Sequence, residues 1–153
     1  MSDVQSEFLF EINITVAAPR KLGTTPLGER IIVTVTGGTF EGPNLKGTIV
    51  EYSGADWLLK RPDGILQIDV RITLQTDDDA LIYMSYHGVR DATPEVAARL
   101  GRGETVDPSD YYFRITPHFE TASEQYAWLN RLIAVGIGDR KASGPCYRVY
   151  KIL

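Results

Sequence analysis

Alternating apolar and polar side chains run along the chain and mark segments that form β-strands with one buried face. The clearest segment is residues 65–75, where leucine, isoleucine and valine take every second position. A period of two fits a strand because successive side chains point to opposite faces of a sheet. This pattern and several β-branched runs predict about eight strands, at residues 8–16, 30–36, 45–52, 65–75, 81–87, 111–116, 132–137 and 147–153.

Polar and glycine-rich segments predict where the chain turns. The acidic triplet at residues 77–79 separates two predicted strands, which we therefore expect to form a hairpin. The glycine-rich run at residues 37–44 predicts a connection between strands. Residues 101–110 are the least hydrophobic stretch and predict a mobile loop.

Helical signals are confined to two short segments. Thr93 and Pro94 supply an N-cap and a first helical residue for a helix over residues 94–100, which Gly101 ends. A second short helix is expected over residues 123–130.

Many short antiparallel strands with few helices favour a closed sheet. A barrel leaves no unpaired edges, so an all-β fold with a single antiparallel β-barrel of about eight strands is expected. The chain has 153 residues, which is the size of one domain, and we expect one domain over residues 1–153. A β-sandwich remains the alternative because periodicity does not separate the two architectures.

Composition and charge exclude several classes of protein. Apolar residues make up 43% of the chain and charged residues 24%, as in folded soluble proteins. The net charge of −4 disfavours binding to the phosphate backbone of nucleic acids. No apolar run is long enough to span a bilayer, and the start of the chain is acidic rather than basic. With a single cysteine, Cys146, a cytoplasmic protein that binds no membrane is expected.

Asp69 and Arg71 are the first candidate functional residues. They lie two apart on one predicted strand and therefore point to the same face. Arg71 can hold an anion or carbonyl while Asp69 orients it, although a structural or solvent-facing ion pair accounts for the same pattern. Tyr83 is expected to point to the same face from the partner strand. Asp69, Arg71 and Tyr83 therefore form the firmer part of the predicted catalytic set.

Asp56 and Trp57 are the second candidate pair. A loop or bulge after Gly54 is expected to deliver the carboxyl group of Asp56 beside the indole of Trp57. An aromatic wall that excludes water raises the pKa of a carboxyl group, which suits a general acid or base. The alternative is a carboxylate that caps backbone amides while Trp57 packs in the core.

Numerous aromatic residues suggest a binding cavity, although aromatic side chains on strands more often simply form a core. The chain has eight tyrosines, two tryptophans and five phenylalanines, and buried tyrosines need partners for their hydroxyl groups. We expect Asp56, Asp69, Arg71 and Tyr83 to converge on one cavity. The wall of this cavity is expected to bind the ligand through Trp57, Tyr86, His87, Phe113 and Trp128.

Metal and cofactor sites are not indicated by the sequence. The only histidines are His87 and His118, and they show no ligand spacing with other metal-binding residues. Gly136 and Gly138 lack the third glycine and the strand-then-helix context of a dinucleotide site, and there is no phosphate loop. We therefore expect no metal and no cofactor.

Several short motifs resemble a bacterial family known as domain of unknown function 3237. The resemblance extends over residues 8–152, and the motifs are GGTFEGP at 37–43, LKG at 45–47, GADW at 54–57, DVR at 69–71, YFR at 112–114 and WLNR at 128–131. It implies a compact β-barrel related in shape to lipocalin-like and allene-oxide-cyclase-like barrels. The resemblance implies no established reaction.

Two functions stay open at this point. The first is a barrel that binds a small aromatic or carbonyl-bearing molecule and acts as a cofactor-free isomerase, cyclase or lyase by acid–base chemistry. The second is a non-catalytic binding or assembly module whose aromatic residues form core and interface. In both, we expect a homodimer, because a small barrel rich in tyrosine can bury further apolar surface by self-association.

Overall fold

The structure is a computed structural model that describes residues 3–153. Over these residues, ten strands, one α-helix and two short 3₁₀ helices follow one another along the chain. Their bounds are β1 Ser6–Val16, β2 Arg20–Thr25, β3 Gly28–Glu41, β4 Lys46–Ile49, β5 Gly54–Lys60, β6 Leu66–Thr76, β7 Leu81–Asp91, α1 Pro94–Gly101, η1 Pro108–Asp110, β8 Tyr112–Glu120, η2 Ala127–Arg131, β9 Ala134–Lys141 and β10 Gly144–Ile152.

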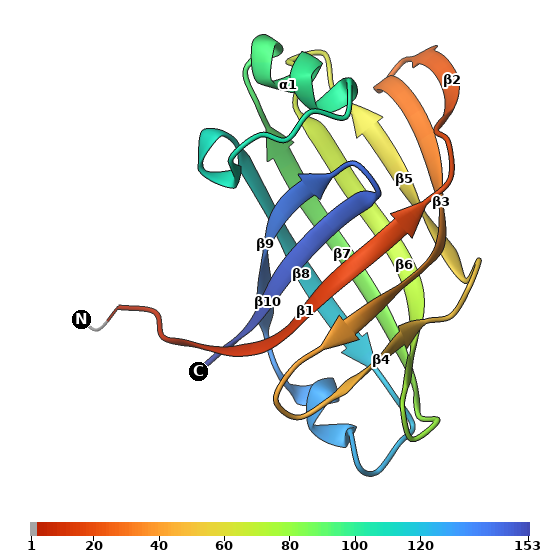
Figure 1. The fold of residues 1–153 in the computed structure, drawn as a ribbon, viewed down its shortest axis with the longest axis vertical. Helices are drawn as coiled ribbons and strands as arrows, with labels where there is room; N and C mark the ends of the chain where they lie inside the picture. The colour runs from red at the N-terminus through yellow and green to blue at the C-terminus, as the bar shows by residue number, and fades with distance from the viewer. Residues whose placement is uncertain (1–2) are drawn as a thin grey trace.

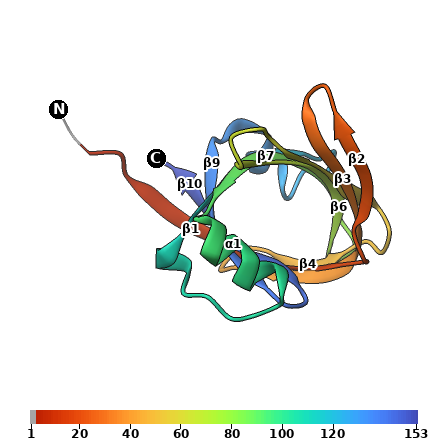
Figure 2. The same cartoon turned by 90° about the horizontal axis from the view of Figure 1, so that it is seen from above.

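The strands close into an antiparallel barrel (Figure 1, Figure 2). Around the ring, the order is β1, β10, β9, β8, β7 and β6, and β3 then closes the ring by pairing with β1. Strands β4 and β5 share one place between β3 and β6, so nine strands fill the eight positions of the ring, and β2 lies outside it against β3. The closed ring confirms the expected barrel and excludes the sandwich.

Two ends of the barrel differ in what lies near them. Helix α1 and the β2–β3 hairpin lie at the upper end in Figure 1, whereas the β6–β7 turn and the η2 segment lie at the lower end. Tyr126, just before η2, donates a hydrogen bond from its hydroxyl to Asp78 in that turn over 3.0 Å. None of the helices in residues 3–153 has the length and apolar character required to cross a membrane.

The lower half of the barrel is filled by apolar side chains. Along β6, the even-numbered residues from 68 to 76 point inward and are buried, as the alternation predicts. Inward residues of β1, β3 and β7 complete this core. Its side chains that are at most 2% exposed include Phe10, Ile12, Phe40, Ile72, Leu74, Ile82 and Met84. This part of the interior is a packed core and leaves no room for a ligand.

The end that carries α1 is different because several of its inward-facing side chains keep partial exposure to solvent. The strand register shows which residues face inward at this end, because paired residues of neighbouring strands point to the same face. Asp56 pairs with Val70, which faces the core, and Val33 pairs with Asp56 on the other side. Arg90 pairs with Leu66, which continues the inward series of β6. The inward side chains at this end that keep partial exposure are Ile31, Val33, Asp56, Leu58, Arg90 and Arg140. We call this solvent-reached part of the interior the open end.

Most predicted elements are present, with corrections where a strand has no simple alternation. The β6–β7 hairpin and helix α1 are confirmed, and Thr93 Oγ1 accepts the N-cap hydrogen bond from Val96 N over 3.2 Å. Residues 54–57 were expected to be a loop or bulge but belong to β5, which is partly covered on both faces and therefore shows no clear period. Strand β2 is exposed along almost its whole length and carries no apolar face that would predict it.

Two further expectations are corrected by local hydrogen bonds and close contacts. The glycine-rich run was expected to be a connection, but β3 continues through it to Glu41. Gly38 has a φ of +139°, and a Cβ there would lie 2.1 Å from the carbonyl oxygen of Asn13, so only glycine fits where β1 crosses. The helix expected over residues 123–130 is only the 3₁₀ helix η2, since Asn130 and Thr121 hydrogen-bond across the segment and hold it as a compact loop.

Candidate functional site

Six polar side chains gather at the open end of the barrel. They come from β5, β7, β9, β10 and the residue before β8, and the inward parity of each strand brings them together. We call them the inner polar cluster: Asp56, Tyr86, Arg90, Tyr111, Arg140 and Tyr147. The cluster lies directly above the packed apolar core.

Asp56 provides the only carboxyl group of this cluster. The backbone N–H of Asp69 donates to Asp56 Oδ1 over 3.1 Å, so the side chain is tied to the neighbouring strand β6. No hydrogen bond to Oδ2 occurs within residues 3–153. Burial raises the pKa of Asp56 from 3.8 to about 7; the nearby Asp69 adds to this, whereas the Asp69 hydrogen bond and Arg90 oppose it. Near neutral pH, Asp56 can therefore both give and accept a proton.

Tyr86 and Tyr147 form the floor of the cluster. Their ring centroids lie 5.3 Å apart in an edge-to-face arrangement, and each residue is 1% exposed. Burial raises the pKa of each hydroxyl well above its usual value, and the nearby Asp56 carboxyl adds to the effect in both. Both hydroxyls therefore stay protonated at neutral pH and are hydrogen-bond donors, and a hydrogen bond between the two side chains raises the pKa of Tyr86 and opposes the rise in the pKa of Tyr147.

Arg90 and Arg140 add positive charge to the cluster. Both are partly buried, and burial lowers the pKa of each guanidinium; for Arg90, the neighbouring Arg140 lowers it further. Both remain charged at neutral pH. The hydroxyl of Tyr111 accepts a hydrogen bond from the backbone N–H of Arg140 over 2.7 Å, which ties the residue before β8 to β9.

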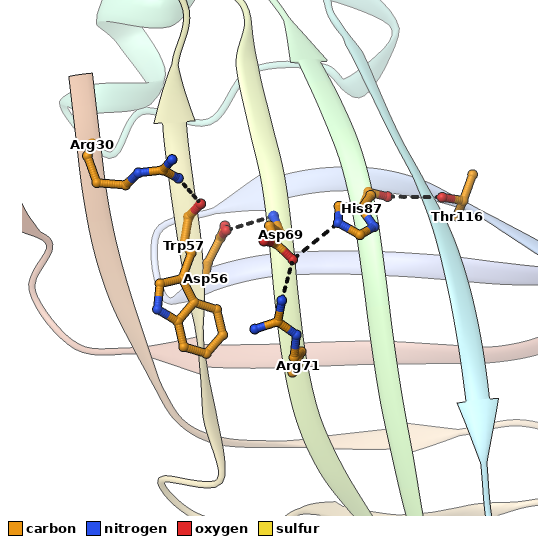
Figure 3. Close-up of polar contacts among 7 residues, drawn as sticks. All are labelled: Arg30, Asp56, Trp57, Asp69, Arg71, His87 and Thr116. Atoms are coloured by element: carbon orange, nitrogen blue, oxygen red, sulfur yellow. Dashed lines mark hydrogen bonds and ion pairs between the residues drawn. The ribbon is translucent and has the colours of Figure 1, made fainter. Parts of the chain in front are cut away.

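Asp69, Arg71 and Tyr83 do not join Asp56 inside the barrel, so the expected convergence on one cavity is wrong. The three side chains lie on the outer face, because their neighbours Val70, Ile72 and Met84 face the core. Parity placed them together, as expected, but could not say which face of the wall is the inner one. Figure 3 shows Asp69 and Arg71 together, with the Asp56 carboxyl reaching only the backbone of Asp69.

An outer cluster forms around Asp69. Its carboxylate lies 3.7 Å from Arg71 Nη2 and 3.4 Å from His87 Nε2, and the Arg71 guanidinium lies 5.0 Å from the ring centre of Trp57 (Figure 3). Arg30 donates to the backbone oxygen of Trp57 over 2.9 Å. The His87 side chain is 75% exposed, so this cluster is solvated and its charges are weakly coupled.

A groove of about 800 Å³ runs along the outer wall beside this cluster. Trp57, Asp69 and His87 line it together with apolar side chains of β8 and β9, among them Tyr112 and Ile137. The groove therefore unites part of the predicted ligand-binding set, but without the carboxyl group of Asp56.

The remaining predicted residues divide between the two ends of the barrel. Tyr86 and Phe113 point into the barrel, where Phe113 packs edge-to-face on Tyr147 at 5.2 Å between ring centroids. Trp128 lies in η2, at the end opposite α1, and is not part of the inner polar cluster. Tyr111 and Tyr147 belong to the aromatic residues that suggested a cavity.

Arg90 and Arg140 are the functional candidates that the sequence analysis missed. A signal was present, because Arg90 continues the inward series of Met84 and Tyr86 on β7. Arg140 likewise continues the inward glycines 136 and 138 of β9. A charged residue in phase with a buried face indicates a polar site inside the fold. Within residues 3–153, no three metal-binding side chains come together.

Comparisons with known proteins agree with this fold. A crystal structure of a conserved protein of unknown function from Rhodopseudomonas palustris superposes with a TM-score of 0.95, at 30% identity, covering 100% of both chains. A crystal structure of a β-barrel-like protein from Acinetobacter baumannii has a TM-score of 0.86 at 41% identity, covering 100% of this chain and 98% of that one. A hydroalkoxylation enzyme, phnH, from the fungus Penicillium herquei is 29% identical over 130 residues, which are 85% of this chain and 71% of the enzyme.

The family assignment rests on nearly the whole chain. The model of the family described as "Protein of unknown function (DUF3237)" matches residues 4–152. This range contains every strand of the barrel and the complete inner polar cluster. The protein therefore belongs to the DUF3237 family, as the motifs in its sequence indicated.

Proposed function

We propose that this protein is an acid–base enzyme that acts on a small aromatic or carbonyl-bearing molecule in the open end of the barrel. The observation that carries the proposal is the position of Asp56. It is the one carboxyl group in the cluster, faces solvent-reached interior space and is held through one oxygen, so that Oδ2 can exchange a proton with a bound molecule.

The neighbouring side chains suit the charge that such a reaction develops. Removal of a proton beside a carbonyl group leaves an enolate, and the hydroxyls of Tyr86 and Tyr147 and the guanidinium of Arg90 can stabilise its oxygen. Asp56 then returns the proton to another atom. Isomerases, cyclases and lyases that work by acid–base chemistry use this sequence of proton removal and return.

The named relative supports the same class of chemistry. Hydroalkoxylation adds an alcohol across a carbon–carbon double bond: the oxygen forms a bond to one carbon, and the other carbon gains a proton while the hydroxyl loses one. A single carboxyl group that gives and takes a proton near neutral pH can serve both steps. We extend to this chain only the proton transfer, since the relative is 29% identical.

Proton exchange provides a direct test. The protein is incubated in D₂O with a panel of phenylacetone, aryl enones and alkenyl phenols, and deuterium incorporation or ring closure is followed by NMR and mass spectrometry. The expected result is exchange or cyclisation of at least one class, lost on Asp56→Asn and kept on Asp63→Asn, which alters a surface turn. If Asp69→Asn abolished the reaction while Asp56→Asn retained it, the chemistry would belong to the outer face and the proposal would be wrong.

The outer groove supports a second candidate, a binding or assembly module that forms a homodimer. Tyr112, Val135 and Ile137 line the groove and are 54%, 36% and 41% exposed, so they leave apolar surface that a second copy can bury. Light scattering at micromolar concentration should show a dimer, and Ile137→Lys should give a monomer. Leu81→Lys changes an exposed apolar residue that does not line the groove and should leave the dimer intact. A wild-type monomer would remove this candidate.

A further inference from the structure

Two arginines bring positive charge into the open end of the barrel without a matching carboxylate. Within residues 3–153, neither Arg90 nor Arg140 comes within 4.0 Å of a carboxylate oxygen. The two are close enough that Arg140 lowers the pKa of Arg90. Charges that are partly removed from water need a counter-charge, and Asp56 is neutral for much of the time near pH 7.

Two arginines on the outer face of the same barrel do have carboxylate partners. Arg148 Nη1 lies 3.0 Å from Glu11 Oε2, and Arg71 lies 3.7 Å from Asp69, and both are about half exposed. Neither inner arginine has a carboxylate partner within residues 3–153, although both are more buried than these two, and Arg140 donates from Nη1 only to the backbone oxygen of Lys141. The chain as a whole carries a charge of −4, so the open end is a local exception that attracts anions.

We infer that the open end binds a small aromatic carboxylate, with its carboxylate group held between Arg90 and Arg140. A guanidinium presents parallel N–H donors that match the two oxygens of a carboxylate. The inference rests on the proposed function, from which it takes the position of the substrate, and it adds that the substrate is negatively charged.

Aromatic side chains next to the two arginines argue for a ring in the ligand. Phe113 pairs with Arg90 across β7 and β8, and Tyr147 pairs with Gly138 beside Arg140. Phe113 packs on both Tyr147 and Tyr111, with ring centroids 5.2 Å and 6.4 Å apart. A flat ligand ring can pack against these aromatic rings while its carboxylate meets the guanidinium groups.

Calorimetric titration with a matched pair of probes tests the inference. The probes are 4-hydroxybenzoate and its neutral counterpart 4-hydroxybenzamide. The acid is expected to bind about tenfold more tightly than the amide or better, because only the acid offers charge-assisted hydrogen bonds. Arg90→Gln and Arg140→Gln should each weaken the acid about tenfold and leave the amide unchanged.

Controls separate a lost charge from a lost fold. Arg148→Gln removes an outer-face arginine and should bind the acid as the parent does. Arg90→Lys keeps the positive charge without the paired N–H donors and should weaken the acid less than Arg90→Gln does. Unfolding without probe shows whether each variant is folded. Equal binding of acid and amide, no binding of either, or equal weakening by Arg71→Gln would overturn the inference. If inorganic phosphate bound as tightly as the acid, the open end would be a general anion site, and the inference of an aromatic carboxylate ligand would be wrong.

The outcomes also distinguish this inference from the proposed function. Asp56→Asn should still bind 4-hydroxybenzoate, because the carboxylate is held by the arginines, while proton exchange is lost. Binding without any exchange in the parent would contradict the enzyme and leave the anion site standing. Proton exchange on neutral compounds without binding of the acid would support the enzyme and contradict the anion site.

Discussion

Asp56 and Asp69 lie on opposite faces of one barrel wall and are joined by a hydrogen bond of 3.1 Å from the backbone N–H of Asp69 to Oδ1 of Asp56. The outer carboxylate is solvated and pairs with Arg71 and His87. The inner carboxyl is withdrawn from water, and burial raises its pKa to about 7. Two aspartates on adjacent strands thus have different chemistry because the wall separates their environments.

Stability should depend on pH through Asp56. Its pKa in the folded state, about 7, lies above the ordinary value of 3.8, so the folded protein binds a proton that the unfolded chain has released. The stabilisation of the protonated form is therefore lost as pH rises from about 4 through 7. Between pH 5 and pH 8, the parent should lose about 3 kcal/mol relative to Asp56→Asn.

Denaturant unfolding of both proteins at the two pH values measures this difference directly. Asp63→Asn serves as the control because the pKa of Asp63, lowered by its hydrogen bonds to Arg61, gives no titration in this range. Parallel pH profiles for the parent and Asp56→Asn would show that Asp56 titrates normally.

Arg71→Met should have little effect on stability. Arg71 is half exposed, and its contacts with Asp69 and the Trp57 ring lie on the solvated outer face. Exposed ion pairs contribute about 0–1 kcal/mol. The free energy of unfolding, measured by urea titration, should fall by no more than about 1 kcal/mol. A much larger loss would mean that the outer cluster holds the wall together.

Gly138→Ala should destabilise the barrel. A Cβ at this position would lie 2.5 Å from the ring of Phe113, which is buried and packed on Tyr147. Overpacking of this kind costs about 1–3 kcal/mol. Gly101→Ala at the end of α1 is the matched control, since its Cβ would meet nothing within 4 Å. Equal thermal stability of the two variants would contradict the close contact of Phe113 with β9.

Thr93→Ala should loosen helix α1 at the open end. The hydroxyl of Thr93 accepts the hydrogen bond from Val96 N, and loss of an N-cap costs about 1 kcal/mol. Amide hydrogen exchange in residues 94–101 should become faster, while exchange in β6 and β7 stays slow. Thr93→Ser keeps the cap and should restore slow exchange. Identical exchange in all three proteins would show that packing alone holds α1.

The local pattern of the sequence predicted most of the strands and the helix. The alternation in residues 65–75 predicted β6 and its hairpin with β7, because a sheet buried on one face imposes a period of two. The cap at Thr93 predicted α1 for an equally local reason. Strand β5 was missed since both of its faces are partly covered, which removes the period.

The sequence by itself determined which residues share a face, and only the closed barrel decided which face is inside. Parity grouped Asp69, Arg71 and Tyr83 correctly, but a period of two is the same for the inner and outer wall. Asp56, Arg90, Arg140 and Tyr147 are far apart in the chain and meet only because the ring closes β1 on β3. The withdrawal of Asp56 from water depends on this closure, so the residue types alone could not locate the site.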